Sequence, residues 1–317
     1  MAGRLAVVLS GGGAKGAFQV GVLDQLITKR RVKFDIAVGT STGAIQAAAV
    51  AQDDIPRLVR LWEGIKGDDD IYKKRSGPFL AIITGQPSIY NAKPLRDLLA
   101  ANIDEAKIRA SGKSLRLGVV SLTSGKFQPI AENASHIADY VYASCAMPFA
   151  FEPLQDAAKE QWVDGGVRDV TPLDAAFELN PRAILVIRAS PPPQPDERKR
   201  YKDLVAIGLR AVDILQSEVS LNDLKNVHLI NALLTARDRQ QVELSRLGIT
   251  GANADRVMNP LRAELARYRM ARVEVIEPAE EHLDTLEFDP AKIRAAIQAG
   301  RDVVEANWDR IEALVEG

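Results

Sequence analysis

The chain has 317 residues, 46% of them hydrophobic, and its 41 Lys and Arg residues nearly balance its 42 Asp and Glu residues. The formal net charge of -1 excludes a bulk electrostatic attraction for nucleic acid or for an anionic membrane. The single cysteine, Cys145, excludes an internal disulfide, and no stretch approaches the roughly 18 apolar residues that span a bilayer. Because residues 1–9 lack the features of a signal peptide, we expect a cytoplasmic protein that binds no nucleic acid.

Strand-like and helix-like segments alternate from the beginning of the chain. Residues 5–9 and 34–38 are apolar runs typical of parallel strands buried on both faces. Residues 17–29 have apolar side chains at helical spacing, and the alanine-rich residues 44–50 also indicate a helix. This order predicts a β-α-β-α unit.

The middle of the chain contains three more predicted strands. Residues 115–122 and 127–131 are joined by Thr123-Ser124-Gly125-Lys126, which is a hairpin signal, and residues 183–187 form another apolar run. Strands interleaved with helices predict an α/β fold with three layers, in which helices cover both faces of a mostly parallel central sheet. We expect catalytic loops at the carboxyl ends of its strands.

A proline-rich and then charged segment, residues 190–200, predicts a linker or a long surface loop. Beyond it, residues 201–317 are expected to form a helical C-terminal part, with helices at 204–234, 256–269 and 290–315 and one strand at 272–276. That strand favours a return to the same sheet. We therefore predict a single domain, residues 1–317, with its motifs in residues 5–190, instead of two independent domains.

The pentapeptide Gly39-Thr40-Ser41-Thr42-Gly43 has a G-x-S-x-G pattern between a predicted strand and a predicted helix. A serine on such an elbow is lifted out of the sheet, and its flanking glycines allow the tight backbone. The following helix directs its N-terminal N–H groups and positive dipole end at the reacting centre. Ser41 is therefore a candidate nucleophile for acyl transfer.

A glycine-rich loop, residues 10–16, follows the first predicted strand. Its Gly11-x-Gly13-x-x-Gly16 spacing matches a dinucleotide fingerprint, but the acidic residue at the expected distance, Asp35, precedes its strand instead of ending it. A phosphate-binding Walker loop would need Lys and then Ser or Thr after Gly16, and the chain has neither. Free N–H groups beside a nucleophilic serine instead predict an oxyanion hole formed by Gly11, Gly12 and Gly13.

The nucleophile needs a base. The three histidines, His136, His228 and His282, lie in helix-like or acidic segments, outside any glycine-framed loop. The carboxylate of Asp164 is the better candidate, because it ends a short strand-like segment and is followed by two glycines that allow a sharp turn. Partial burial would raise the pKa of Asp164 and make it a better base for a hydroxyl. The alternative is a turn aspartate, which an Asp-Gly pair often marks.

These three motifs, in this order, resemble those of the patatin-like phospholipases, a family of lipid acyl hydrolases. The glycine-rich loop, the Ser41 elbow and Asp164-Gly165-Gly166 match the family pattern, and Ala143-Ser144-Cys145-Ala146-Met147-Pro148-Phe149 is similar to its stretch before the aspartate. The resemblance spans roughly residues 5 to 190.

The resemblance implies a serine–aspartate dyad, Ser41 and Asp164, that works without a histidine, a metal or another cofactor. Gly11, Gly12 and Gly13 would bind the oxyanion. Lys15 would help to position the glycines or a phosphate, although a solvated lysine is an equal alternative. The supporting positions in the three motifs are Lys15, Gly16, Gly39, Gly43, Gly165 and Gly166.

The resemblance also implies the substrates, which would be fatty acyl esters of phospholipids or lysophospholipids. Two alternatives stay open, a non-catalytic lipid-binding or regulatory protein on the same fold and a histidine-dependent esterase. Residues 71–95 carry Lys73-Lys74-Arg75 beside the apolar Pro78-Phe79-Leu80-Ala81-Ile82-Ile83, which suggests transient contact with a membrane surface and a peripheral location. A cap segment packed onto the core explains the same stretch and is favoured.

Overall fold

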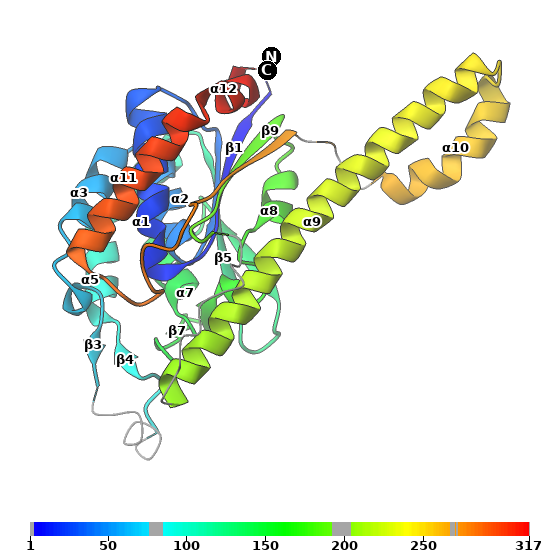
Figure 1. Ribbon diagram of the computed structural model, residues 1–317. Helices are drawn as coiled ribbons and strands as arrows, with labels where there is room; N and C mark the ends of the chain where they lie inside the picture. The colour runs from blue at the N-terminus through cyan, green and yellow to red at the C-terminus, as the bar shows by residue number, and fades with distance from the viewer. Residues whose placement is uncertain (1–2, 76–84, 192–203, 267–269, 271, 317) are drawn as a thin grey trace.

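The computed structural model describes residues 3–75, 85–191, 204–266, 270 and 272–316 (Figure 1). Within these residues, one sheet contains eight strands in the order β10-β9-β1-β2-β5-β8-β7, with β6 paired to β5, and β3 pairs with β4 apart from it. The strands are β1 (Leu5–Leu9), β2 (Ile36–Thr40), β3 (Lys73–Lys74), β4 (Tyr90–Asn91), β5 (Ser114–Ser121), β6 (Phe127–Ala131), β7 (Leu154–Gln155), β8 (Gln161–Asp164), β9 (Ala183–Ile187) and β10 (Arg272–Ile276).

The sheet is mixed and mostly parallel. Strands β10, β9, β1, β2 and β5 run parallel to one another, whereas β6 and β8 are antiparallel to β5 and β7 is antiparallel to β8. The carboxyl ends of β1 and β2 therefore lie at one edge, in register at Leu9 and Gly39. Because the two loops that follow these strands begin there, the glycine-rich loop and the Ser41 elbow are neighbours.

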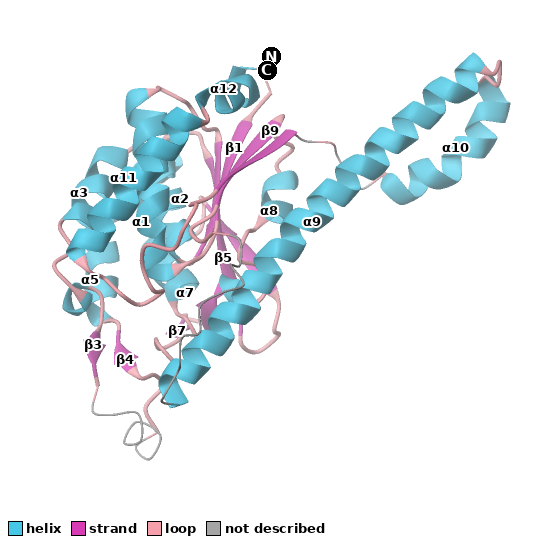
Figure 2. Ribbon diagram, in the orientation of Figure 1, coloured by secondary structure: helices cyan, strands magenta, loops and turns pink. Residues whose placement is uncertain are grey.

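Helices cover both faces of the sheet, as Figure 2 shows, so the predicted three-layer α/β/α fold is confirmed. Alternate side chains of β1 enter different cores, with Leu5, Val7 and Leu9 on one face and Ala6 and Val8 on the other. The helices are α1 (Ala17–Leu23), α2 (Thr42–Ala51), α3 (Ile55–Glu63), α5 (Lys93–Asn102), α6 (Glu105–Ala110), α7 (Ile137–Cys145), α8 (Leu173–Phe177), α9 (Leu204–Arg246), α10 (Gly251–Leu265), α11 (Pro290–Ala306) and α12 (Trp308–Glu316).

The C-terminal part supplies both a strand and a projecting hairpin. Strand β10 pairs in parallel with β9, so this part does return to the sheet. Helices α9 and α10 contact each other, and the second half of α9 projects with α10 away from the sheet (Figure 1). Of the helices that the structure describes, none combines the length and apolar character needed to cross a bilayer, α9 included.

Several predicted boundaries were wrong. The helix expected at 204–234 continues to Arg246, and the one expected at 290–315 breaks at Asn307 into α11 and α12. The helix expected at 17–29 is α1 followed by a wider π-helical turn at Asp24–Lys29. Most of the linker predicted at 190–200, and the apolar stretch Pro78 to Ile83, lie outside the described residues.

Candidate active site

Ser41 lies on a sharp turn between β2 and α2, with φ 56° and ψ -129°. This backbone conformation is unfavourable for a residue with a side chain, and the two flanking glycines make the turn possible. A Cβ atom at Gly39 would lie 2.1 Å from the carbonyl oxygen of Gly43, and one at Gly43 would lie 2.2 Å from that of Leu9. The elbow therefore requires glycine at both positions, where the sequence has it.

Ser144 holds this elbow from the next layer. The Ser41 N–H donates to the Ser144 Oγ at 2.8 Å, and the Ser144 hydroxyl donates to the Gly118 carbonyl oxygen at 2.6 Å. One buried hydroxyl thus ties the backbone of Ser41 to α7 and β5. The role of Ser144 could not be predicted from the sequence, because its partners lie 103 and 26 residues away in the chain.

The glycine-rich loop lies directly beside the elbow. Gly13 has φ 57°, and a Cβ atom there would lie 2.1 Å from the Thr285 carbonyl oxygen, so this position requires glycine. The Gly11 N–H donates to the Val170 carbonyl oxygen at 3.0 Å and is therefore already occupied. Within the described part of the chain, the N–H groups of Gly12 and Gly13 donate to no protein acceptor, and both residues line the same pocket as Ser41. Of the three glycines predicted to form an oxyanion hole, Gly12 and Gly13 therefore have N–H groups without a described protein acceptor, and Gly11 does not.

Two buried glutamines hold the glycine-rich loop, Gln19 from α1 and Gln46 from α2. The Gln19 Nε2 donates to the carbonyl oxygens of Ser10 and Ile187 at 3.0 and 2.8 Å. The Gln46 Nε2 donates to the Gly16 carbonyl oxygen at 3.1 Å. Both side chains are fully buried, and each interrupts an apolar helical segment, which is the signal that sequence analysis overlooked.

Asp164 ends β8 and its side chain is buried, only 1% exposed. Its Oδ1 accepts the Gly166 N–H at 2.7 Å, and its carboxylate lies beside the Ser41 side chain. Burial raises the pKa of Asp164 to about 7, against the opposing effects of the Gly166 N–H and the Ser41 hydroxyl. A Cβ atom at Gly165 would lie 2.5 Å from the Gly118 carbonyl oxygen, so β8 turns away here only because glycine follows Asp164. The structure brings the two predicted dyad residues together.

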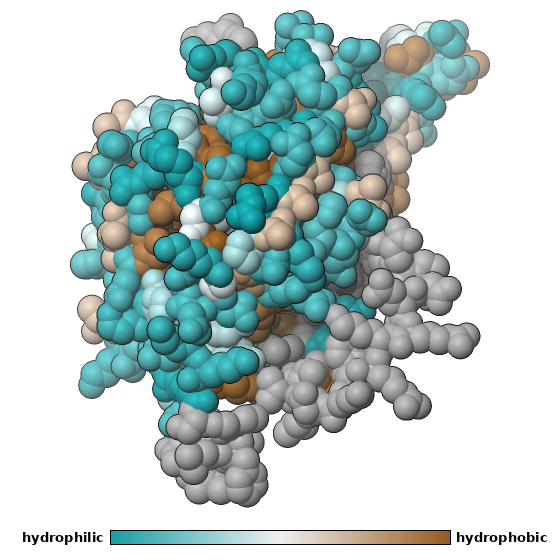
Figure 3. Space-filling view, turned by 60° about the vertical axis from the view of Figure 1, so that its left-hand side comes forward, coloured by the Kyte–Doolittle hydropathy of each residue, from teal (hydrophilic) through white to brown (hydrophobic). Residues whose placement is uncertain are grey.

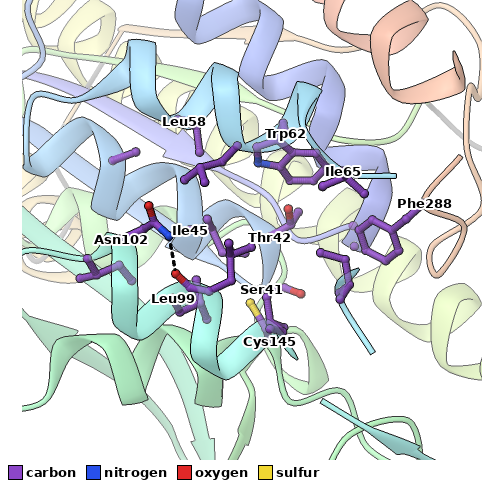
Figure 4. Close-up of a pocket in the computed structure, with 18 of the residues that line it drawn as sticks. Ser41, Thr42, Ile45, Leu58, Trp62, Ile65, Leu99, Asn102, Cys145 and Phe288 are labelled. Atoms are coloured by element: carbon purple, nitrogen blue, oxygen red, sulfur yellow. Dashed lines mark hydrogen bonds between the residues drawn. The ribbon is translucent and has the colours of Figure 1, made fainter. Parts of the chain in front are cut away.

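Ser41 and Asp164 face a pocket with an empty volume of about 1070 Å³, part of it open to solvent. Its lining is mostly aliphatic and aromatic, from α2, α3 and α5 and from the loop before α11. Figure 4 shows Asn102 at one end and Phe288 at the other, with Ser41 and Cys145 between them. On the face seen in Figure 3, most of the surface is hydrophilic, with apolar side chains visible in hollows between polar ones. A serine on a strained elbow, a carboxyl group of raised pKa beside it and an apolar pocket are the features expected of an ester hydrolase that acts on lipids.

Comparison with known proteins decides the family. A family model described as Patatin-like phospholipase matches residues 7–177, which include all three motifs. The chain belongs to the patatin-like phospholipase family. This confirms the resemblance found in the sequence.

Individual relatives are more distant. The patatin-like chain is 28% identical over 196 residues to the uncharacterized protein YjjU of Escherichia coli (strain K12), covering 60% of this chain and 53% of that protein. It is 27% identical over 190 residues to the triacylglycerol lipase SDP1L of Arabidopsis thaliana, covering 56% of this chain and 23% of that one. The crystal structure of VipD from Legionella pneumophila aligns over 98% of this chain and 67% of its own, with a TM-score of 0.47 and 16% identity.

Lys15 lies outside the pocket of this patatin-like protein. Its side chain is only 7% exposed and forms an ion pair with Glu281. The solvated-lysine alternative is therefore wrong. The ion pair joins the glycine-rich loop to the segment before α11, which fits a role for Lys15 in positioning the loop. Because its ammonium group is paired with a carboxylate, Lys15 is less suited to binding a phosphate.

Neither described histidine side chain lines the Ser41 pocket. His136 precedes α7 and is exposed, and His282 lines a separate small pocket beside Lys15. The side chain of His228 lies outside the described residues, although its backbone is part of α9. Within the described ranges, Asp164 is the carboxylate that contacts the nucleophile, and no three His, Cys, Asp or Glu residues form a group that could hold a metal.

Cys145 also lines the pocket, next to the dyad. Burial, and to a lesser extent the charge of Asp164, raise the pKa of its thiol well above the ordinary value. The thiolate is the nucleophilic form of cysteine, so this environment disfavours Cys145 as a nucleophile. Its thiol contributes apolar surface to the pocket instead.

Proposed function

We propose that this protein hydrolyses carboxylic esters of fatty acids, with Ser41 as nucleophile and Asp164 as general base. The observation that carries the proposal is the pair formed by the Ser41 side chain and the buried Asp164 carboxylate, which lie close enough for the hydroxyl to lower the pKa of the carboxyl group. It lies at the edge of an apolar pocket large enough for an acyl chain. Membership of the patatin-like phospholipase family supports the same chemistry.

In the proposed first half-reaction, ionised Asp164 accepts the Ser41 hydroxyl proton while Oγ attacks the ester carbonyl carbon. The oxygen of the tetrahedral intermediate takes up negative charge, and the N–H groups of Gly12 and Gly13 donate hydrogen bonds to it. Protonated Asp164 then gives its proton to the leaving alcohol as the carbon–oxygen bond breaks. The product is an acyl ester of Ser41.

The second half-reaction repeats these steps with water. Asp164 accepts a proton from a water molecule, whose oxygen attacks the acyl carbonyl carbon. The same two glycine N–H groups stabilise the oxyanion, and the proton on Asp164 passes to the departing Ser41 Oγ. The fatty acid leaves and the dyad returns to its starting state.

For the alcohol part we infer phospholipids or lysophospholipids, on the description of the family. Triacylglycerols are the second candidate, because one relative is named a triacylglycerol lipase. To separate them, lysophosphatidylcholine, phosphatidylcholine and triacylglycerol carrying one common acyl chain are offered to the protein and released fatty acid is quantified. We expect release from the two phospholipids to exceed release from triacylglycerol. Hydrolysis of triacylglycerol alone would contradict the phospholipid assignment and leave the ester hydrolysis standing.

Asp164 also makes the rate depend on pH. Because a base must be ionised to accept a proton, kcat/KM should rise about tenfold per pH unit below about pH 7 and level off above it. Fatty acid release from a soluble ester, followed chromatographically between pH 4 and 10, measures this. Circular dichroism at each pH serves as the control for folding. A limb that titrates near pH 4, or activity that falls as pH rises through 7, would show that Asp164 is not the base.

A further inference from the structure

The pocket extends away from Ser41 along one face of α2. Thr42, Ile45, Ala49 and Gln52 all line it. Their spacings of three, four and three residues place them on the same side of the helix. At about 1.5 Å per residue, the ten steps from Thr42 to Gln52 measure about 15 Å.

Two more helices form the walls of this groove. Leu58, Leu61 and Trp62 line it from α3, and Leu98 and Leu99 line it from α5. Figure 4 shows Leu58 and Trp62 on one side and Leu99 on the other, with Ile45 between them. Between Thr42 and Gln52 the lining is therefore hydrocarbon on every described side, as a saturated chain requires.

Polar side chains close the far end of the groove. The Arg57 Nε donates to the Asn102 Oδ1 at 2.8 Å, and its Nη2 donates to the Ala101 carbonyl oxygen at 3.2 Å. The Gln52 Nε2 donates to the Asn102 carbonyl oxygen at 3.1 Å. These bonds link α3 and the C-terminal end of α2 to the end of α5, across the groove. A hydrocarbon chain that continued past these residues would have to break their hydrogen bonds, and the buried polar groups would then lack partners, which is unfavourable.

We propose that the groove between α2, α3 and α5 binds the acyl chain of the ester, and that Gln52, Arg57 and Asn102 limit this chain to about 12 carbons. An extended saturated chain advances about 1.25 Å per carbon–carbon bond, so 15 Å accommodates about 12 of them. The inference rests on the proposed function, since it takes the reacting carbonyl to lie at Ser41. Beyond that function, the inference specifies the length of the acyl chain and the residues that limit this length.

The test is a series of esters that share one alcohol and carry saturated acyl chains from butanoyl to octadecanoyl, in a constant excess of detergent. We expect kcat/KM to rise roughly fourfold per methylene, the usual gain for burying one, up to decanoyl or dodecanoyl. From hexadecanoyl onward it should fall at least about tenfold, because the chain must leave the groove or disrupt its end. A rate that ignores acyl length, or that still rises at octadecanoyl, would overturn the inference.

Two variants change the length of the groove. Phenylalanine in Ala49→Phe fills it about 10 Å from Thr42 and should move the optimum to hexanoyl or octanoyl. Arg57→Ala removes the bridge between α3 and α5 and should move the optimum toward hexadecanoyl. The matched control is Ala100→Phe, the same substitution at an exposed position of α5, which should leave the profile unchanged. An optimum that Ala49→Phe does not shift would contradict the placement of the chain.

A binding measurement distinguishes failure of this inference from failure of the proposed function. Affinities of free fatty acids of the same lengths are measured for Ser41→Ala by isothermal titration calorimetry. Tightest binding at ten to twelve carbons, in a wild-type protein that hydrolyses no ester, would reject the proposed function and support the groove. Ester hydrolysis with no preference for length, in either rate or binding, would reject the groove and support the function.

Discussion

Replacing Ser41 by alanine is expected to lower kcat by about 10⁴ to 10⁶, the range seen when a serine nucleophile is removed. The substitution takes away the attacking oxygen, while the backbone N–H of residue 41 keeps its hydrogen bond to Ser144. The fold should therefore survive. Initial rates on a soluble fatty acyl ester, with thermal unfolding followed in parallel, measure both effects.

The matched control for this experiment is Ser135→Ala, at an exposed position before α7. It should hydrolyse the ester at the wild-type rate. Activity of Ser41→Ala within about tenfold of wild type would remove Ser41 from the nucleophile role. A comparable loss in a folded His228→Ala or His282→Ala variant, and not in Asp164→Asn, would favour the histidine-dependent esterase.

The substitution Asp164→Asn should lower kcat by about 10⁴, because an amide cannot accept the Ser41 proton. It should also stabilise the protein at pH 8. Burial raises the pKa of Asp164 to about 7 in the folded state, so folding favours the protonated carboxyl group. That contribution is complete below the unfolded pKa of about 4 and is lost as pH rises to about 7. The asparagine variant has no proton to lose and keeps the stability that the wild type gives up.

Chemical denaturation at pH 5 and pH 8 measures this effect. The difference between a pKa of about 7 in the folded state and about 4 in the unfolded state corresponds to at most about 4 kcal/mol at pH 8, and to less at pH 5. An equal difference in unfolding free energy between variant and wild type at both pH values would show that the Asp164 carboxyl is not the group responsible. A variant that is inactive but more stable would identify Asp164 as a residue kept for chemistry at a cost to the fold.

Strands could be predicted from local sequence. The runs at 5–9, 127–131, 183–187 and 272–276 were predicted with the bounds that the structure has, whereas 34–38 and 115–122 were wrong by up to two residues for β2 and β5. Strands buried on both faces carry continuous apolar runs, as β1 and β9 do. The apolar pattern therefore specifies that these strands exist more reliably than it specifies where they end.

Helix ends were harder to predict. No proline or glycine lies between residue 234 and Gly248, and α9 ends two residues before Gly248, whose φ of 74° is the left-handed conformation that terminates helices. The predicted end at 234 was wrong because it ignored this glycine. The break between α11 and α12 falls at Asn307, where the sequence has neither glycine nor proline.

The candidate site also contains a part that could be predicted from local sequence and a part that could not. Ser41, Asp164 and their glycines lie in short motifs whose backbone demands are local, and sequence analysis could name them. The occupied Gly11 N–H could not be predicted, because its acceptor, Val170, is 159 residues away. Arg57 and Asn102 belong to two different helices, and their spacing across the groove exists only after those helices have packed.

Ser41 lies immediately before the first residue of α2, and Gln52 lies immediately after its last residue. The distance between the Ser41 hydroxyl and the polar end of the pocket is therefore set by the rise of one helix and does not depend on loop movements. The number of residues in α2 therefore sets the length of the groove. Substitutions in α3 or α5 would widen or narrow the groove without changing its length. The length would change only through an insertion or deletion in α2, and each inserted residue would also rotate the lining side chains by about 100° around the helix.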